Sequence, residues 1–204
     1  MDAQGTVATR KALHAVAEVV MAGPQYRRSG TIRLRVTPGG FATVAEPALR
    51  VEGGVLVAGD SRTELDGRTL RELGEATGEG AWKPEGVYHD GSGASPDDAV
   101  RVDAEAAGVL AEALRRGDAA LREFASGVTP VLWPEHFDLG ITVDEVNYGV
   151  SLGDGYLGEP YAYVGPWQAR DGEFWNAPFG AARPLSQVED LRGFFEEGRR
   201  LAAG

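Results

Sequence analysis

The chain has 204 residues, no cysteine and a formal net charge of −11. A chain of this length buries roughly 70% of the surface that it exposes when unfolded, so its core needs no disulfide or metal ion. The absence of cysteine excludes disulfides, thiolate metal sites, iron–sulfur clusters and cysteine nucleophiles, and it is typical of a reducing compartment. A strongly acidic chain repels nucleic acid and anionic lipid, so we expect neither nucleic acid nor a membrane as a partner.

Basic side chains are concentrated near the start of the chain. The first 36 residues carry six basic and two acidic side chains, a net charge of +4, and we expect them to pair with the acidic remainder. The apolar run at residues 12–22 is interrupted by His14 and Glu18 and is too short to span a bilayer. With no export or membrane signal in the sequence, we expect a cytoplasmic protein.

The first third of the chain predicts one helix followed by four strands. Apolar residues recur at helical spacing over residues 9–22, and Gly23 and Pro24 are expected to end that helix. Hydrophobic alternation and Gly-rich turns then predict an antiparallel meander. Its strands are residues 31–37, 41–45, 49–52 and 55–58.

The middle of the chain predicts two helices with a loop between them. Residues 69–76 form the short helix, and residues 78–95, rich in Gly, Pro and Asp, form a loop, a lid or a surface insertion. Asp103 is a good N-cap for the long helix, which extends to about residue 125 and is kinked or split near Gly117.

The last third predicts strands and a terminal helix. The strands are residues 128–133, 141–150 and 161–167, and the helix covers residues 186–203 with Ser186 and Glu189 as its capping box. The whole pattern predicts an α+β fold. We expect a single domain over residues 1–204, with an antiparallel sheet that is strongly curved or doubled and three to four helices packed on it.

The strand predicted at residues 141–150 breaks its own alternation. The pattern that puts Ile141 and Val143 on one face puts Glu145 and Asn147 on that face as well. Either the pattern reverses near residues 144–145, which the opposite face favours, or Glu145 and Asn147 point into a pocket.

Aromatic residues gather in the last third, where ten of the seventeen lie between positions 133 and 179. Tyr161, Tyr163 and Trp167 share one face of a predicted strand, which suits stacking on a flat ligand and equally suits an ordinary core. A pocket in this region would bind a small organic ligand. Its candidate binding residues are Trp133, Asn147, Tyr148, Asp154, Glu159, Tyr161, Tyr163, Trp167 and Trp175.

Three ionisable side chains, Glu135, His136 and Asp138, follow a predicted strand within four residues. An imidazole held by a carboxylate is a common proton-transfer pair near neutral pH, so His136 with Asp138 or Glu135 is the candidate catalytic pair of a hydrolase or isomerase. The alternative is that His136 and Asp138 hold a turn through hydrogen bonds to the backbone. No two of the three histidines have the spacing of a zinc helix, so we predict no metal ion and no cofactor.

Three motifs lie in order in the second half of the chain. They read W-P-E-H-F-D at residues 133–138, N-Y-G-V-S-L-G-D at residues 147–154 and E-P-Y-A-Y-V at residues 159–164. In these motifs the chain resembles an uncharacterised bacterial family, a domain of unknown function, although Glu135 stands where that family more often has a second histidine. The resemblance implies no activity, but it draws attention to His136, Asp138, Asn147, Asp154, Glu159, Tyr161 and Tyr163.

Three functions therefore stay open. The aromatic region forms a ligand pocket, the residues around His136 catalyse a reaction, or the aromatic surface binds a protein partner. The sequence contains no G-x-S-x-G elbow, phosphate loop or strand-anchored G-x-G-x-x-G, which disfavours serine hydrolases, nucleotide triphosphatases and dinucleotide dehydrogenases. Whether the chain is a monomer or a homo-oligomer is left undetermined.

Overall fold

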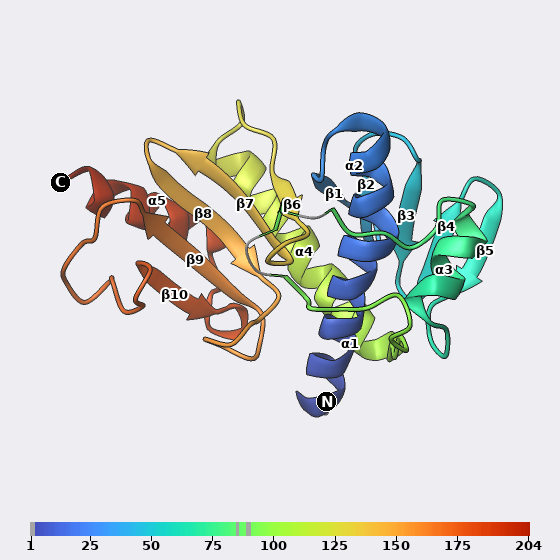
Figure 1. The fold of residues 1–204 in the computed structure, drawn as a ribbon. Helices are drawn as coiled ribbons and strands as arrows, with labels where there is room; N and C mark the ends of the chain where they lie inside the picture. The colour runs from blue at the N-terminus through green and yellow to red at the C-terminus, as the bar shows by residue number, and fades with distance from the viewer. Residues whose placement is uncertain (1–2, 85, 89–90) are drawn as a thin grey trace. The chain divides into compact units, whose positions relative to one another are not determined.

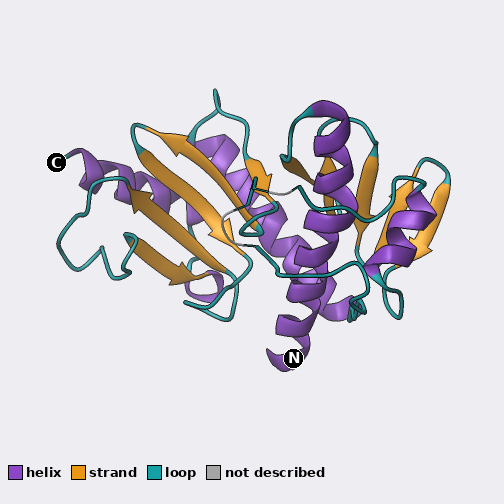
Figure 2. Cartoon of the chain, viewed as in Figure 1, coloured by secondary structure: helices purple, strands orange, loops and turns teal. Residues whose placement is uncertain are grey.

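The computed structural model describes residues 3–84, 86–88 and 91–204 and shows a mixed fold of helices and antiparallel strands (Figures 1 and 2). The chain divides into two compact units. The first unit is Met1–Glu112 with Leu132–Phe137, and the second unit is Ala113–Val131 with Asp138–Gly204. The α+β class is confirmed, whereas a single cooperative domain stays a prediction.

The strands of the first unit form an antiparallel ladder in the order β6-β1-β2-β3-β4-β5. Their bounds are Leu34–Thr37 (β1), Gly40–Thr43 (β2), Leu49–Glu52 (β3), Val55–Ala58 (β4), Ser61–Glu64 (β5) and Val131–Trp133 (β6). The four predicted strands are confirmed with small shifts of their ends. Strand β5 escaped prediction because it is a largely exposed strand at the end of the ladder and therefore has no apolar alternation.

The first helical run is longer than predicted. It consists of α1 (Ala3–Ala15), the π-helical segment η1 (Val16–Ala22) and α2 (Gly23–Ser29), which Figure 1 shows as one continuous run. The run ends where Gly30 adopts a φ of 72°. Near its end Arg28 pairs with Glu79 at 2.6 Å, as expected for the basic N-terminal segment.

The prediction that Gly23 and Pro24 end this helix is wrong. The backbone N–H of Gly23 donates to the carbonyl oxygen of Glu18, a π-helical hydrogen bond. Pro24 has no N–H to offer to the preceding turn, and the backbone N–H of Trp82 donates to the Val19 carbonyl oxygen instead, at 2.9 Å. Any Cβ on Gly23 would collide with the carbonyl of Trp82. Position 23 therefore requires glycine, because the segment containing Trp82 crosses the helix there.

The two helices of the middle region begin where predicted. Helix α3 (Leu70–Thr77) has Thr69 as its N-cap in a capping box with Glu72. Helix α4 (Ala104–Phe124) is capped by Asp103, whose Oδ1 accepts from a backbone N–H at 2.8 Å. The helix is not split at Gly117. A Cβ there would lie 2.9 Å from a methyl carbon of Val150, so this glycine permits close packing of helix on strand.

The strands of the second unit pair antiparallel in the order β10-β9-β8-β7. Their bounds are Asp138–Val143 (β7), Val146–Ser151 (β8), Tyr161–Pro166 (β9) and Ala181–Pro184 (β10), followed by the short 3₁₀ helix η2 (Leu185–Gln187) and helix α5 (Leu191–Ala203). Helix α5 begins after Asp190, whose side chain accepts from the backbone N–H of Gly193, so the predicted capping box of Ser186 and Glu189 is wrong.

The strand predicted at residues 141–150 is a β-hairpin. Asp144 and Glu145 form its two-residue turn with φ values of 53° and 61°, and Val143 pairs with Val146. The single strand predicted there is therefore wrong. The alternation does change near residues 144–145, as favoured, but at a turn that requires positive φ at both positions and not within one strand. Glu145 and Asn147 are both exposed, and Glu145 but not Asn147 lies in the lining of the pocket described below.

Neither ladder closes on itself among the described strands, and the strong curvature predicted from the sequence is not confirmed. The core of the second unit lies where α4 and α5 meet β8, with Tyr148 packed against Phe124 (ring centroids 4.6 Å apart) and Phe195 (6.1 Å). Over the described ranges, we find no helix with the length and apolar character to cross a bilayer.

Candidate functional site

The motif at residues 133–138 forms the end of β6 and the turn after it. His136 is exposed at this turn, and its ring has no hydrogen-bond or ion-pair partner in the described part of the chain. Glu135 and His136 belong to the first unit. Asp138 belongs to the second, where its Oδ2 accepts from the Tyr163 hydroxyl at 2.5 Å. Their joint catalytic role stays a prediction.

A different histidine holds this turn. The Nε2 atom of His14 lies 2.8 Å from the carbonyl oxygen of Pro134 and 3.1 Å from that of Glu135, so it carries the proton and donates. Phe137, with a φ of 52°, stacks on the His14 ring at 5.4 Å. Burial lowers the pKa of His14, which keeps the imidazole neutral.

The two tyrosines of β9 lie side by side in the second unit, with ring centroids 6.5 Å apart, and each donates to its own carboxylate. Tyr161 donates to Asp154 at 2.5 Å, and Tyr163 covers two glycines, since a Cβ on Gly140 or Gly149 would lie 2.8 or 2.5 Å from its hydroxyl. Burial is the largest cause that raises the pKa of both phenols, and the carboxylates beside them add to it. The group is therefore packed rather than open to a ligand.

The other predicted binding residues are dispersed. Trp133 belongs to the first unit, where Arg33 lies 5.6 Å from its ring. Asn147 bonds to Thr142, Glu159 accepts from Ser186, and Trp175 packs edge-on against Phe174. These contacts do not bring the four residues to a common hollow.

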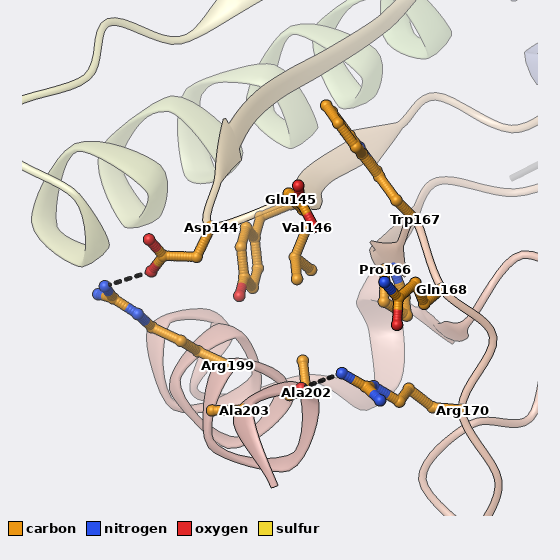
Figure 3. A pocket seen from close by; sticks show the side chains of 11 residues that line it. Asp144, Glu145, Val146, Pro166, Trp167, Gln168, Arg170, Arg199, Ala202 and Ala203 are labelled. Atoms are coloured by element: carbon orange, nitrogen blue, oxygen red, sulfur yellow. Dashed lines mark hydrogen bonds and ion pairs between the residues drawn. The ribbon is translucent and has the colours of Figure 1, made fainter.

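Two of the predicted residues, Tyr148 and Trp167, do line one pocket of the second unit. Its volume is about 150 Å³, and it lies beside the Asp144–Glu145 turn and the end of α5 (Figure 3). It is lined by Asp144, Glu145, Val146, Tyr148, Pro166, Trp167, Gln168, Arg170, Arg199, Ala202 and Ala203.

The pocket contains an unused hydrogen-bond donor. The Tyr148 hydroxyl is buried and has no partner among the described residues. Burial raises its pKa to about 12, with Arg199 acting in the opposite direction and Asp144 in the same one, so the phenol is neutral at physiological pH.

Two arginines and an indole complete the pocket. Arg199 pairs with Asp144 at 2.8 Å, and Arg170 donates to the Ala202 carbonyl oxygen at 2.6 Å. The Trp167 side chain is largely open to solvent, at 64% exposure, and Figure 3 shows it across the pocket from Arg199. A ligand in this pocket can therefore meet a phenol, guanidinium groups and an aromatic face.

Sequence reasoning missed Arg170 and Arg199 in this pocket, and it missed a buried carboxylate in the first unit, Glu18. The two arginines carry no local signal, because they come from separate segments. Glu18 did carry one, since His14 and Glu18 are four residues apart in an apolar helical run and must share its buried face.

No protein-family model, curated protein or solved structure matches this chain. Within the described ranges, no three His, Asp or Glu side chains gather in a group that could hold a metal ion.

Proposed function

We propose that the second unit binds a small planar organic molecule in the pocket lined by Tyr148 and Trp167. The observation that carries the proposal is the buried, unpartnered Tyr148 hydroxyl in the wall of a hollow. A buried polar group without a partner costs about 1–3 kcal/mol, and a ligand that accepts its hydrogen bond would offset that cost.

The volume limits the ligand to about one ring. An engineered protein cavity of about 150 Å³ accommodates benzene, whereas pockets for larger ligands measure about 300–1,000 Å³. The pocket here is about 150 Å³, and its lining includes the largely exposed Trp167, whose indole face can stack on a planar group.

The polar groups favour a ligand with a carbonyl or carboxylate oxygen. Tyr148 offers a hydroxyl donor, and Arg170 and Arg199 each have guanidinium N–H groups beyond those used in their internal contacts. Benzoate, a planar ring with one carboxylate, is therefore a suitable probe.

The test is a benzoate titration of the full chain followed through the indole N–H resonance of Trp167. Tyr148→Phe removes the hydroxyl and keeps the ring, and it should weaken benzoate binding about 10- to 100-fold, the range for a hydrogen bond to a charged group. Tyr156→Phe, in an exposed tyrosine outside the pocket, is the matched control and should leave the affinity unchanged.

Stability separates a lost ligand contact from a damaged fold. Because the Tyr148 hydroxyl has no partner in the described chain, Tyr148→Phe should leave the free energy of unfolding unchanged or raise it. Unaltered benzoate affinity in Tyr148→Phe, or a benzoate response that avoids Trp167, would contradict the proposal.

A further inference from the structure

A buried carboxylate lies in the first unit, apart from the pocket proposed above. Glu18 belongs to the π-helical segment η1, and its side chain is 0% exposed. Its Oε2 atom accepts from the backbone N–H of Ser92 at 3.0 Å and from the Ser92 hydroxyl. Its Oε1 atom has no hydrogen-bond partner among the described residues. A buried charge that is incompletely paired is unfavourable, and π-helical segments occur frequently at functional sites.

Among the described residues, Lys83 is the lysine that faces Glu18, and its ammonium is held at a distance. The Nζ atom of Lys83 lies 3.8 Å from Oε2, too far for a hydrogen bond. The Nε2 atom of His14 lies 3.9 Å from Oε1, but burial lowers the pKa of His14, and its N–H is directed at the carbonyl oxygen of Pro134. The imidazole is therefore neutral, and the Lys83 ammonium compensates the carboxylate incompletely.

A tyrosine adds two further features suited to an amine. The Lys83 ammonium lies 5.5 Å from the ring centre of Tyr88, within the range of a cation–π interaction. The Tyr88 hydroxyl is buried and also lacks a partner in the described chain. Burial, and then the negative charge of Glu18, raises the Tyr88 pKa, so the hydroxyl remains neutral and can accept a hydrogen bond.

A glycine lies close against both charged groups. A Cβ on Gly91 would collide with Oε1 of Glu18 and would lie 3.2 Å from Nζ of Lys83. Any larger residue would therefore occupy the space between the carboxylate and the ammonium.

We propose that Glu18 and Tyr88 form a binding site for a small primary alkylamine, and that the Lys83 ammonium occupies this site when no ligand is bound. The incoming ammonium replaces that of Lys83, donates to Oε1 of Glu18 and to the Tyr88 hydroxyl, and contacts the Tyr88 ring. Competition by Lys83 lowers the apparent affinity in proportion to the fraction of molecules in which the lysine fills the site.

The test uses propylammonium chloride on the full chain, with sodium chloride at equal ionic strength as the blank. The backbone amide resonance of Ser92 is the reporter, because its N–H donates to Glu18. Lys83→Met removes the ammonium and keeps most of the apolar stem, and it should bind propylammonium about tenfold more tightly than the wild type if the lysine fills the site nine times in ten. Glu18→Gln should abolish the saturable shift.

A pair of glycine variants decides the matter if Glu18→Gln fails to fold. Gly91 and Gly93 both have positive φ, at 147° and 71°, but a Cβ on Gly93 would meet nothing within 4 Å. Gly91→Ala should block propylammonium, and Gly93→Ala should bind it like the wild type. Equal affinity of the wild type and Lys83→Met, or saturable binding that survives both Glu18→Gln and Gly91→Ala, would overturn the proposal.

Discussion

Buried polar side chains in the first unit differ in how completely they are paired. Gln25 uses every donor and acceptor available to it. Its Nε2 donates to the carbonyl oxygens of Thr31 and Arg33 at 3.0 and 2.9 Å. Its Oε1 accepts from the backbone N–H groups of Val44 and Ala45 at 2.7 and 2.8 Å. These four hydrogen bonds account for the burial of Gln25, which links α2 to the segments beside β1 and β2.

Glu18 and Tyr148 differ from Gln25 because their side chains are not fully hydrogen-bonded. Each is buried and keeps an oxygen without a hydrogen-bond partner in the described chain. Because folding alone gives no reason to retain such atoms, we take them as the residues most informative about ligands.

His14 should make the free energy of unfolding fall as the pH becomes mildly acidic. Burial lowers its pKa below the ordinary 6.5, against the opposing effect of Glu18 and with a small contribution from Arg10 in the same direction. Below pH 6.5, His14 therefore binds a proton in the unfolded chain but not in the folded one. The stabilising contribution is complete above that pH and is lost as pH falls.

The measurement is urea unfolding between pH 5 and 7.5. His14→Gln should flatten the profile by up to about 1.4 kcal/mol per pH unit, the value for one proton. His136→Gln removes an imidazole at an exposed position without a partner in the described chain, and it is the matched control. A profile that flattens in the control and not in His14→Gln would contradict this assignment.

At the scale of elements, the first helical run depends on a segment far away in the sequence. The Trp82 N–H satisfies the Val19 carbonyl oxygen, and the Trp82 carbonyl occupies the space beside Gly23. Local propensity predicts a helix end at Gly23-Pro24, and a tertiary contact overrides it.

Glycine-to-alanine changes in two helices should have opposite effects. Gly23→Ala forces a methyl group against the backbone at Trp82, and we expect a loss of at least about 2 kcal/mol in the free energy of unfolding. Gly108 is an exposed position of α4 where a Cβ meets nothing within 4 Å, so Gly108→Ala should add about 0.4–1 kcal/mol to the free energy of unfolding. Denaturant unfolding of both variants checks this, and stabilisation by Gly23→Ala would refute the crossing geometry.

The hairpin of β7 and β8 shows that local sequence patterns can also fail to predict a turn. Two-residue hairpin turns with positive φ are normally signalled by Asn-Gly or Asp-Gly, and here Asp144 and Glu145 stand in those positions. The pattern of apolar residues located the change of face near residues 144–145, but it predicted one continuous strand where the chain turns back. At this turn, Asp144 makes a tertiary contact, an ion pair with Arg199 on α5.

At the scale of the whole molecule, buried phenols in both units should make the fold sensitive to alkali. Burial raises the pKa of Tyr88 in the first unit and of Tyr148, Tyr161 and Tyr163 in the second, from an ordinary value of 10. Both states are protonated below pH 10, and above it the unfolded chain loses protons first. Stability is therefore complete below pH 10 and falls as pH rises.

Tyrosinate absorbance and circular dichroism, followed together as pH is raised from 9 to 12, test this expectation. These four tyrosines should ionise in one step with the loss of structure, because the folded environment opposes their charge. Gradual ionisation of all tyrosines before any structural change would contradict it.

Local patterns predicted much of the fold because they report local physics. Hydropathy alternation located β1 to β4, β6 and β9, but it merged β7 and β8 into one strand and missed β5 and β10. Capping residues such as Thr69 and Asp103 located helix starts. The candidate site was predicted less well. Tyr148 and Trp167 line the pocket, whereas the tyrosines of β9 are packed against partners from other segments, Asp138 of β7 and Asp154 of the loop after β8.

The amino-acid sequence by itself determined the acidic, cysteine-free character of the chain, its α+β class and the positions of most helices and strands. Those properties depend on composition and on neighbours within a few residues. The tertiary structure alone decided that the first helix continues past Pro24, that an arginine-flanked pocket forms around Tyr148, and that Lys83 faces Glu18. Each of these requires a group from a distant segment to supply a hydrogen bond, a charge or a wall, and no local pattern specifies that partner.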